Sequence, residues 1–204
     1  MPRSLQKLVD LISELPGIGP RQARRVVQFL LRTDMAFKKR LAEAIVTMNE
    51  NISQCSSCFR FDEVNAKGTC SLCANPNRDD AVLVVVEKDV DVDGVEAVHS
   101  YKGQYFVLGA LMPLARQRKN VLSPRVNELI KRLKAQQHIQ EVILAFSTTP
   151  EGDFTAKELK NKIQESFPTT KVTVLGRGLS LGAEIEYADQ ETLRSALQGR
   201  SEIF

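Results

Sequence analysis

The first 50 residues carry apolar side chains at the three- and four-residue spacing of amphipathic helices. This spacing predicts one helix over residues 3–15, a second that starts after Pro20, and a third over about residues 35–50. Pro16 ends the first helix, because proline cannot continue the hydrogen-bond ladder of a helix interior. The N-terminal quarter of the chain is therefore predicted to be helical.

Beyond residue 80 the pattern changes to continuous apolar runs that alternate with helical segments. The predicted strands cover residues 81–86, 105–109, 141–146, 171–176 and 184–187. The predicted helices cover residues 155–166 and 190–198, and another starts at Ser123-Pro124, where serine suits the N-cap and proline the first helical position. Continuous apolar strands separated by helices are typical of a helix-covered parallel sheet, so we expect an α/β fold with a mostly parallel sheet.

Four cysteines lie between the helical part and the predicted sheet, where the periodicity is lost. Cys55 and Cys58 form one C-x2-C pair, and Cys70 and Cys73 form a second pair eleven residues later. Two such pairs fit a closed, structural zinc site with four thiolate ligands and no open coordination position. Two disulfides and a redox-active C-x-x-C are the alternatives. The first is disfavoured in a reducing compartment, and the second does not explain the duplicated pair.

The charge is unevenly distributed along the chain. The net charge is +3 overall, but residues 1–50 and 101–150 are basic while residues 51–100 are acidic. Basic segments indicate a polyanionic partner, although solvated surfaces of opposite sign would give the same pattern. The longest apolar runs are too short to span a bilayer and the N-terminus has no signal-peptide pattern, so we expect a cytoplasmic protein.

The turn between the first two helices reads Pro16-Gly17-Ile18-Gly19-Pro20 and resembles the helix-hairpin-helix motif of DNA-binding proteins. Gly17 and Gly19 are expected to allow positive φ and a close approach to a phosphate, at a helix N-terminus that favours anions. Arg21 and Arg25 follow one turn apart and are predicted to contact phosphates without reading base sequence. The alternative is a hairpin that only packs or dimerises.

Carboxylates follow two of the predicted strands. Glu87 and Asp91 come after the strand at 81–86, and Glu151 and Asp153 come after the strand at 141–146. The carboxyl ends of neighbouring parallel strands meet at one edge of a sheet, which is the usual functional edge. This arrangement resembles the Toprim domain of topoisomerases and primases, in which a glutamate and a later acidic pair hold magnesium.

The order of these segments, followed by Arg177-Gly-Leu-Ser-Leu-Gly-Ala-Glu-Ile-Glu-Tyr-Ala-Asp189, resembles the RecR family of bacterial recombination mediators over nearly the whole chain. The resemblance implies a helical region at 1–52, a zinc finger at 53–78, a Toprim domain at 79–176, and a tail at 177–204 that packs on or swaps with a neighbouring subunit. It also implies a homo-oligomeric DNA clamp, a dimer or a tetrameric ring, that acts with RecO, and often RecF, to load RecA onto single-stranded gaps. A basic stretch with Arg116, Arg118 and Lys119 departs from the family pattern.

The resemblance implies a protein without catalytic residues, with the acidic cluster of Glu87, Asp91, Glu151 and Asp153 as a docking site for RecO. The alternative is a magnesium-dependent nuclease or primase-like enzyme of the Toprim type. Glu87, Glu151 and Asp153 alone would suffice to hold Mg²⁺ in such an enzyme.

Overall fold

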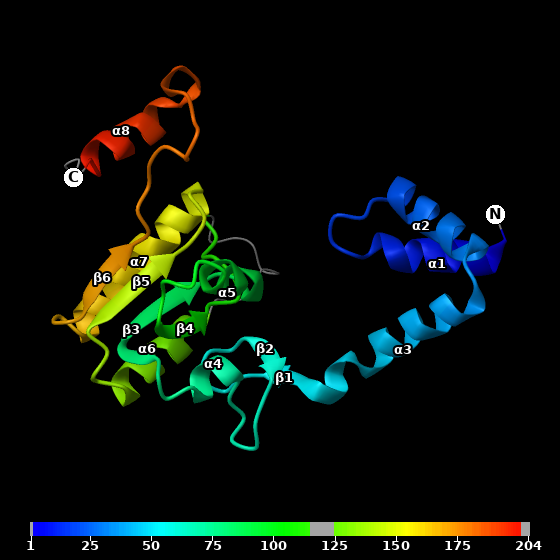
Figure 1. Cartoon of the computed structure of the whole chain (residues 1–204), viewed down its shortest axis with the longest axis horizontal. Coiled ribbons are helices and arrows are strands. Elements are labelled where there is room, and N and C mark those ends of the chain that lie inside the picture. The colour runs from blue at the N-terminus through cyan, green and yellow to red at the C-terminus, as the bar shows by residue number, and fades with distance from the viewer. Residues whose placement is uncertain (1, 115–124, 201–204) are drawn as a thin grey trace. The chain divides into compact units, whose positions relative to one another are not determined.

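The computed structural model describes residues 2–114 and 125–200, and its chain divides into two compact units, Met1–Ile52 and Ser53–Phe204. The family prediction of an α/β fold with an N-terminal helical region is confirmed (Figure 1). The basic stretch at 116–119 and the predicted helix start at Ser123-Pro124 lie outside the described residues.

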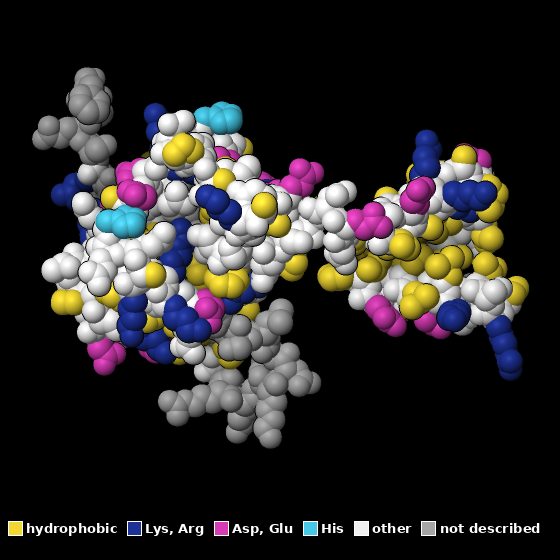
Figure 2. Space-filling view, turned by 90° about the horizontal axis from the view of Figure 1, so that it is seen from below, with side chains coloured by type: hydrophobic (Ala, Val, Ile, Leu, Met, Phe, Trp, Pro, Cys, Tyr) yellow, Lys and Arg dark blue, Asp and Glu magenta, His cyan; other side chains and the backbone are white. Residues whose placement is uncertain are grey.

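The N-terminal unit consists of α1 (Arg3–Ser13), α2 (Pro20–Arg32) and α3 (Met35–Asn51). Its small core is formed by Val9 of α1 with Ala23 and Val27 of α2. The side chain of Asp34 caps α3 by accepting a hydrogen bond of 2.7 Å from the amide of Phe37. Within this unit, an apolar groove of about 560 Å³ runs between the three helices, and hydrophobic side chains gather over it (Figure 2).

Three short elements form the segment that carries the cysteines. They are β1 (Ile52–Gln54), β2 (Phe61–Glu63), which pairs with β1, and the single-turn helix α4 (Ser71–Ala74). The isolated bridge between Val64 and Cys70 closes the loop that connects the two C-x2-C pairs. Little regular structure forms here because few residues between the cysteines are apolar.

The larger unit is built on a parallel sheet of β3 (Asp79–Val86), β4 (Gly103–Val107), β5 (Glu141–Ala145) and β6 (Lys171–Val174). The strand order is β4-β3-β5-β6, so β3 and β5 are central. The helices α5 (Asp89–Glu96), α6 (Val126–Ala135) and α7 (Pro150–Ser166) connect successive strands, and α8 (Gln190–Gln198) follows the sheet. Both faces of the sheet are covered, which explains why its strands read as continuous apolar runs.

Alternate residues of β3 point to opposite faces of the sheet. Leu83 and Val85 belong to the core shared with Leu129 of α6 and Leu159 of α7. The intervening residues of β3, Val84 and Val86, belong to a second core that contains Val92 of α5 together with Cys55, Cys58 and Cys70. The cysteine segment is therefore one of the layers that bury the sheet.

The structure corrects two sequence predictions about elements and adds one helix that the pattern did not indicate. Residues 185–187 form a 3-10 helix and not a strand. Helix α7 begins at Pro150 and not at residue 155, because the side chain of Thr149 accepts a hydrogen bond from the amide of Gly152 and Pro150 occupies the first turn. Asp89–Glu96 is a helix that its β-branched residues concealed. Its first-turn carboxylates suit the positive end of the helix dipole.

Among the residues that the structure describes, every helix is too short or too polar to cross a lipid bilayer.

Candidate metal centre and nucleic-acid interface

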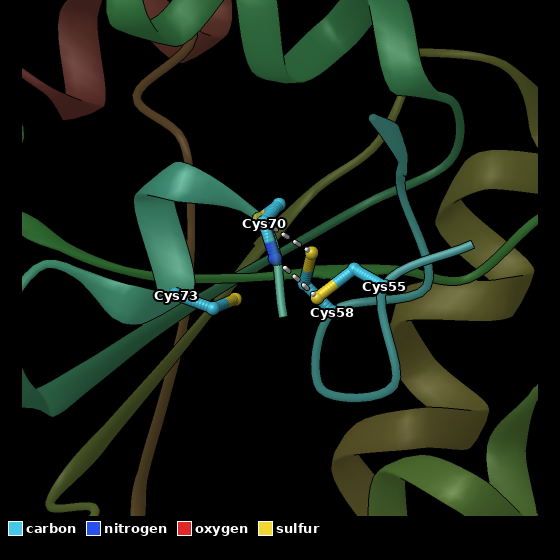
Figure 3. A group of neighbouring side chains, drawn as sticks. All are labelled: Cys55, Cys58, Cys70 and Cys73. Carbon is cyan, nitrogen blue, oxygen red and sulfur yellow. Dashed lines mark hydrogen bonds between the residues drawn. The ribbon is translucent and has the colours of Figure 1, made fainter. Parts of the chain in front are cut away.

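The four cysteines converge from both ends of the loop that connects them. Cys55 and Cys58 flank a tight turn, Cys70 is the N-cap of α4, and Cys73 lies in that helix (Figure 3). Their Sγ atoms all lie within 4.8 Å of one another. None of the cysteines is in a disulfide, and all but Cys73 are fully buried.

This geometry fits zinc binding. The Sγ atoms of Cys58 and Cys70 are 3.7 Å apart, and a tetrahedral site with Zn–S bonds of about 2.3 Å has edges of about 3.8 Å. Hydrogen bonding between the thiols lowers the pKa of Cys55 and raises the pKa of Cys58. The thiolate is the form that ligates metals, and a bound cation would favour it at every one of the four cysteines. Four protein ligands leave no open position for a substrate, so the site is suited to a structural role.

Hydrogen bonds to the backbone of the first cysteine pair connect it to the sheet. The amide of Val107 in β4 donates to the carbonyl of Cys58 at 2.8 Å. The guanidinium Nη1 of Arg132 in α6 donates to the carbonyls of Ser57 and Tyr105, at 3.0 and 2.7 Å. Burial lowers the pKa of Arg132, and the negative charges of Cys73, Cys58 and Cys55 oppose that shift. Arg132 is thus a partly buried cation beside the four-cysteine cluster.

Phe59 adds an aromatic contact between the first cysteine pair and the sheet. It follows Cys58 with a φ of 64°, a conformation uncommon for a bulky residue. Its ring packs edge-on against Phe106 at 5.4 Å between centroids, and the guanidinium of Arg125 lies 5.3 Å from the ring centroid. Phe59 and Arg132 were not predicted from the sequence. Phe59 is marked there only by its place next to Cys58, and Arg132 by no pattern at all.

The glycine hairpin has one position that favours glycine for its backbone conformation. Gly17 has a φ of +77°, which favours glycine, and open space where a Cβ would lie. The prediction that Gly19 also adopts positive φ is wrong. Gly19 is the extended N-cap of α2, with a φ of −80°, and it provides no side chain to cap the helix. Pro20 then begins the helix, leaving the amides of the next residues without a side-chain cap, an arrangement suited to an anion.

The exposed face of α2 is positively charged. Arg21 and Arg25 are both exposed, one turn apart, on a helix that contains no acidic residue. The groove along this face is lined by further arginines and by Phe29. Both the helix N-terminus and the side chains therefore favour phosphate groups.

The predicted acidic cluster is distributed over two helix starts at one edge of the sheet. Glu87 directly follows β3, and Glu151 and Asp153 lie in the first turn of α7, which follows the neighbouring strand β5. The ends of these strands are paired, since Val86 is in register with Ala145. Among the described residues, the four cysteines are the only group of three or more potential ligand side chains placed to hold one metal ion, so these carboxylates do not form such a group.

Several of these carboxylates already have partners within the protein. Asp91 accepts a hydrogen bond of 2.8 Å from the amide of Lys88 and so caps its own helix. Asp153 forms an ion pair with Arg177 of the C-terminal segment. Glu151 is exposed.

Gly152 is required between the two carboxylates of the α7 N-terminus. A Cβ built at this position would lie 2.0 Å from the carbonyl oxygen of Ser147, which is backbone and cannot move aside cheaply. The Glu-Gly-Asp sequence therefore reflects the close approach of the β5–α7 loop to the first turn of α7.

Taken together, these features define a class of protein. A helix-hairpin-helix unit, a four-cysteine metal centre and a parallel Toprim sheet combine elements suited to work on nucleic acid. Family models match residues 5–48 (RecR, helix-hairpin-helix), 81–176 (Toprim domain) and 178–201 (RecR, C-terminal).

Full-length relatives agree with these matches. The chain is 40% identical to the recombination protein RecR of Herpetosiphon aurantiacus over 99% of its own length and 96% of the relative's. It is 37% identical to RecR of Porphyromonas gingivalis, with 98% and 94% of the two chains covered, and 36% identical to RecR of Lacticaseibacillus casei, with 99% and 98% covered. The chain belongs to the RecR family, and this membership supports a role in recombination repair.

Proposed function

We propose that this protein is a DNA-binding recombination mediator that acts in the cytoplasm by binding DNA and proteins, without catalysing a reaction. The observation that carries the proposal is the hairpin of the N-terminal unit, where Gly17 and Gly19 precede an uncapped helix start and a face of exposed arginines. Such contacts recognise phosphates and are independent of base sequence.

The DNA-binding proposal is tested with the double variant Arg21→Ala/Arg25→Ala. Binding should weaken equally for all DNA sequences, and the log–log salt dependence should become shallower by roughly one unit per lost phosphate contact. The double variant Lys160→Ala/Lys162→Ala on α7 removes the same charge from the other unit and serves as the control. Unchanged affinity and slope in the arginine variant would assign the hairpin to packing or dimerisation.

The metal of the four-cysteine centre is proposed to be Zn²⁺, one ion per chain. The donor set consists of four sulfur ligands within 4.8 Å of one another, a set that zinc favours, and burial of three cysteines in the second core suits a structural ion. When bound, zinc supplies folding stability to a segment that buries little apolar surface of its own. No reaction step is assigned to it.

For the acidic edge we propose docking of the basic surface of RecO, with RecF where it is present, ahead of RecA loading. Glu87, Glu151 and Asp153 are at the carboxyl ends of adjacent strands, where they would repel DNA phosphates unless a cation intervened. Complementary charge would speed the encounter with a basic partner and fix its orientation. On docking, Asp153 would either leave its ion pair with Arg177 to bind a cation of the partner, or bind both cations at once.

A homo-oligomeric clamp, a dimer or a tetrameric ring, is proposed from the apolar groove of the N-terminal unit. The groove is lined almost entirely by hydrophobic side chains of α1, α2, α3 and the loop between α1 and α2, and two of them, Leu15 and Ile45, are more than half exposed. A monomer rarely leaves such a groove open to solvent, and a second copy would cover it. Mass under native conditions, with and without DNA, tests this proposal.

The second candidate function is a magnesium-dependent Toprim nuclease, which the acidic residues of the sheet edge favour. Glu151→Ala and Asp153→Ala distinguish the two functions when RecO affinity, DNA affinity and cleavage of gapped DNA with Mg²⁺ or Mn²⁺ are measured on the same proteins. The mediator function predicts weaker RecO binding, impaired RecA loading and intact DNA binding. A metal-dependent cleavage that both changes abolish would overturn it.

A further inference from the structure

A shallow groove of about 680 Å³ runs along the polar face of α2 and has an aromatic ring among its arginines. We call it the arginine groove. It is lined by Arg24, Arg25, Gln28, Phe29, Arg32 and Thr33. Phe29 is 58% exposed, although an aromatic ring of this size is among the most costly side chains to leave in water.

The ring of Phe29 is supported from behind. It packs edge-on against Phe37 of α3, with 6.0 Å between the ring centroids and an interplanar angle of 86°. Phe37 is itself held at the start of α3, where its amide donates to the Asp34 side chain. Phe29 is therefore a positioned ring with an exposed surface, and little further ordering would be needed for it to stack on a ligand.

The surroundings of Phe29 are cationic. Arg24, Arg25 and Arg32 line the same groove, and the described residues contain no carboxylate within 4.0 Å of their guanidinium nitrogens. A protein partner that covered the ring would have to desolvate these guanidinium groups, at a cost that only well-placed carboxylates offset. A ligand with both anionic groups and flat aromatic faces matches the groove better.

We propose that the arginine groove binds single-stranded DNA, with a base stacked on Phe29 and the neighbouring phosphates contacted by Arg24, Arg25 and Arg32. This inference rests on the proposed DNA binding and specifies its preferred substrate. In a duplex, each base is already covered by its neighbours and offers no face to the ring. In a single strand the faces are free, and stacking on aromatic side chains does not depend on base identity.

We expect Phe29 to contribute to the affinity for single-stranded DNA and not to the affinity for duplex DNA. Phe29→Leu keeps an apolar side chain but removes the π-face, so it should lower affinity for an oligothymidylate about tenfold, within the range of one stacked base. Affinity for a duplex of equal length should change less than about twofold, since the phosphate contacts remain. Val46→Ala removes an apolar side chain that is 78% exposed on α3 and serves as the control.

A second variant reports stacking directly. The chain contains three tyrosines but no tryptophan, so Phe29→Trp introduces a single tryptophan, which can be excited selectively above the tyrosine absorption, at the centre of the arginine groove. Titration with oligothymidylate should quench its emission and leave affinity near that of the natural protein, whereas duplex DNA should quench it much less.

Three results would overturn the inference, each with a different meaning. If Arg21→Ala/Arg25→Ala weakens DNA binding while Phe29→Leu leaves single-strand affinity unchanged, the stacking fails but DNA binding by the hairpin survives. If the arginine variant also has no effect, the DNA-binding proposal itself fails. If Phe29→Leu weakens both DNA forms equally and lowers the native mass, Phe29 is a contact between copies of the chain.

Discussion

Replacing Arg132 with methionine tests whether the metal centre is joined energetically to the sheet. The substitution keeps an unbranched, largely apolar side chain but removes the donor of two hydrogen bonds to backbone carbonyls, those of Ser57 in the first cysteine pair and Tyr105 in β4, and of one to the side chain of Gln136. Each acceptor left without a partner costs about 1–3 kcal/mol, and relief of the guanidinium's own desolvation offsets part of the sum. We expect a net loss of about 3 kcal/mol.

For a unit of this size, that loss lowers Tm by roughly 6–12 °C in a thermal unfolding scan. Zinc should also be released faster to a chromogenic chelator, because a cation beside the four thiolates is lost. Lys131→Met is the matched control: it removes the same charge from the adjacent position of α6, where the lysine side chain is 71% exposed and forms an ion pair with Glu128 of the same helix. Its effect should stay below about 0.5 kcal/mol. Equal Tm and equal zinc release in the two variants would refute the proposal that Arg132 couples the metal centre to the sheet.

Further predictions concern the metal, the close backbone approach in α7, and an ion pair. Cys58→Ser should abolish stoichiometric zinc in elemental analysis and lower soluble yield, whereas the neighbouring Ser57→Ala should do neither. Gly152→Ala should cost about 1–3 kcal/mol in denaturant unfolding because of the clash with the β5–α7 loop, while Gly94→Ala, with open space at its Cβ, should be neutral or stabilising. Hydrogen bonding from Arg78 lowers the pKa of Glu96. The contribution of the Glu96 carboxylate to the free energy of unfolding is therefore complete above the ordinary glutamate pKa of about 4.3, and it is lost as pH falls through the lowered pKa. Glu96→Gln should reduce stability at neutral pH and make stability less dependent on pH in the acid range. An unchanged pH dependence in that range would contradict the role given to the Arg78–Glu96 pair.

The sequence by itself determined the features that depend on local pattern. The two C-x2-C pairs predicted a four-thiolate site because each short pair can place both ligands on one ion, and the structure brings all four sulfurs together. The apolar runs predicted the parallel sheet, since a strand buried on both faces has no polar alternation. The glycine and proline residues marked the hairpin before α2, although only Gly17 has the positive φ expected of both glycines.

Only the tertiary structure decided which side chains meet across the fold. Arg132 is 59 positions from Cys73 in the chain, and helical periodicity gives no sign that its guanidinium reaches the first cysteine pair. Asp91 and Asp153 read as members of one acidic cluster, but each is engaged elsewhere, Asp91 in capping its own helix and Asp153 in pairing with Arg177. Sequence pattern encodes burial and local hydrogen bonding. The partner of a polar side chain depends instead on how separate elements pack, and that depends on the whole chain.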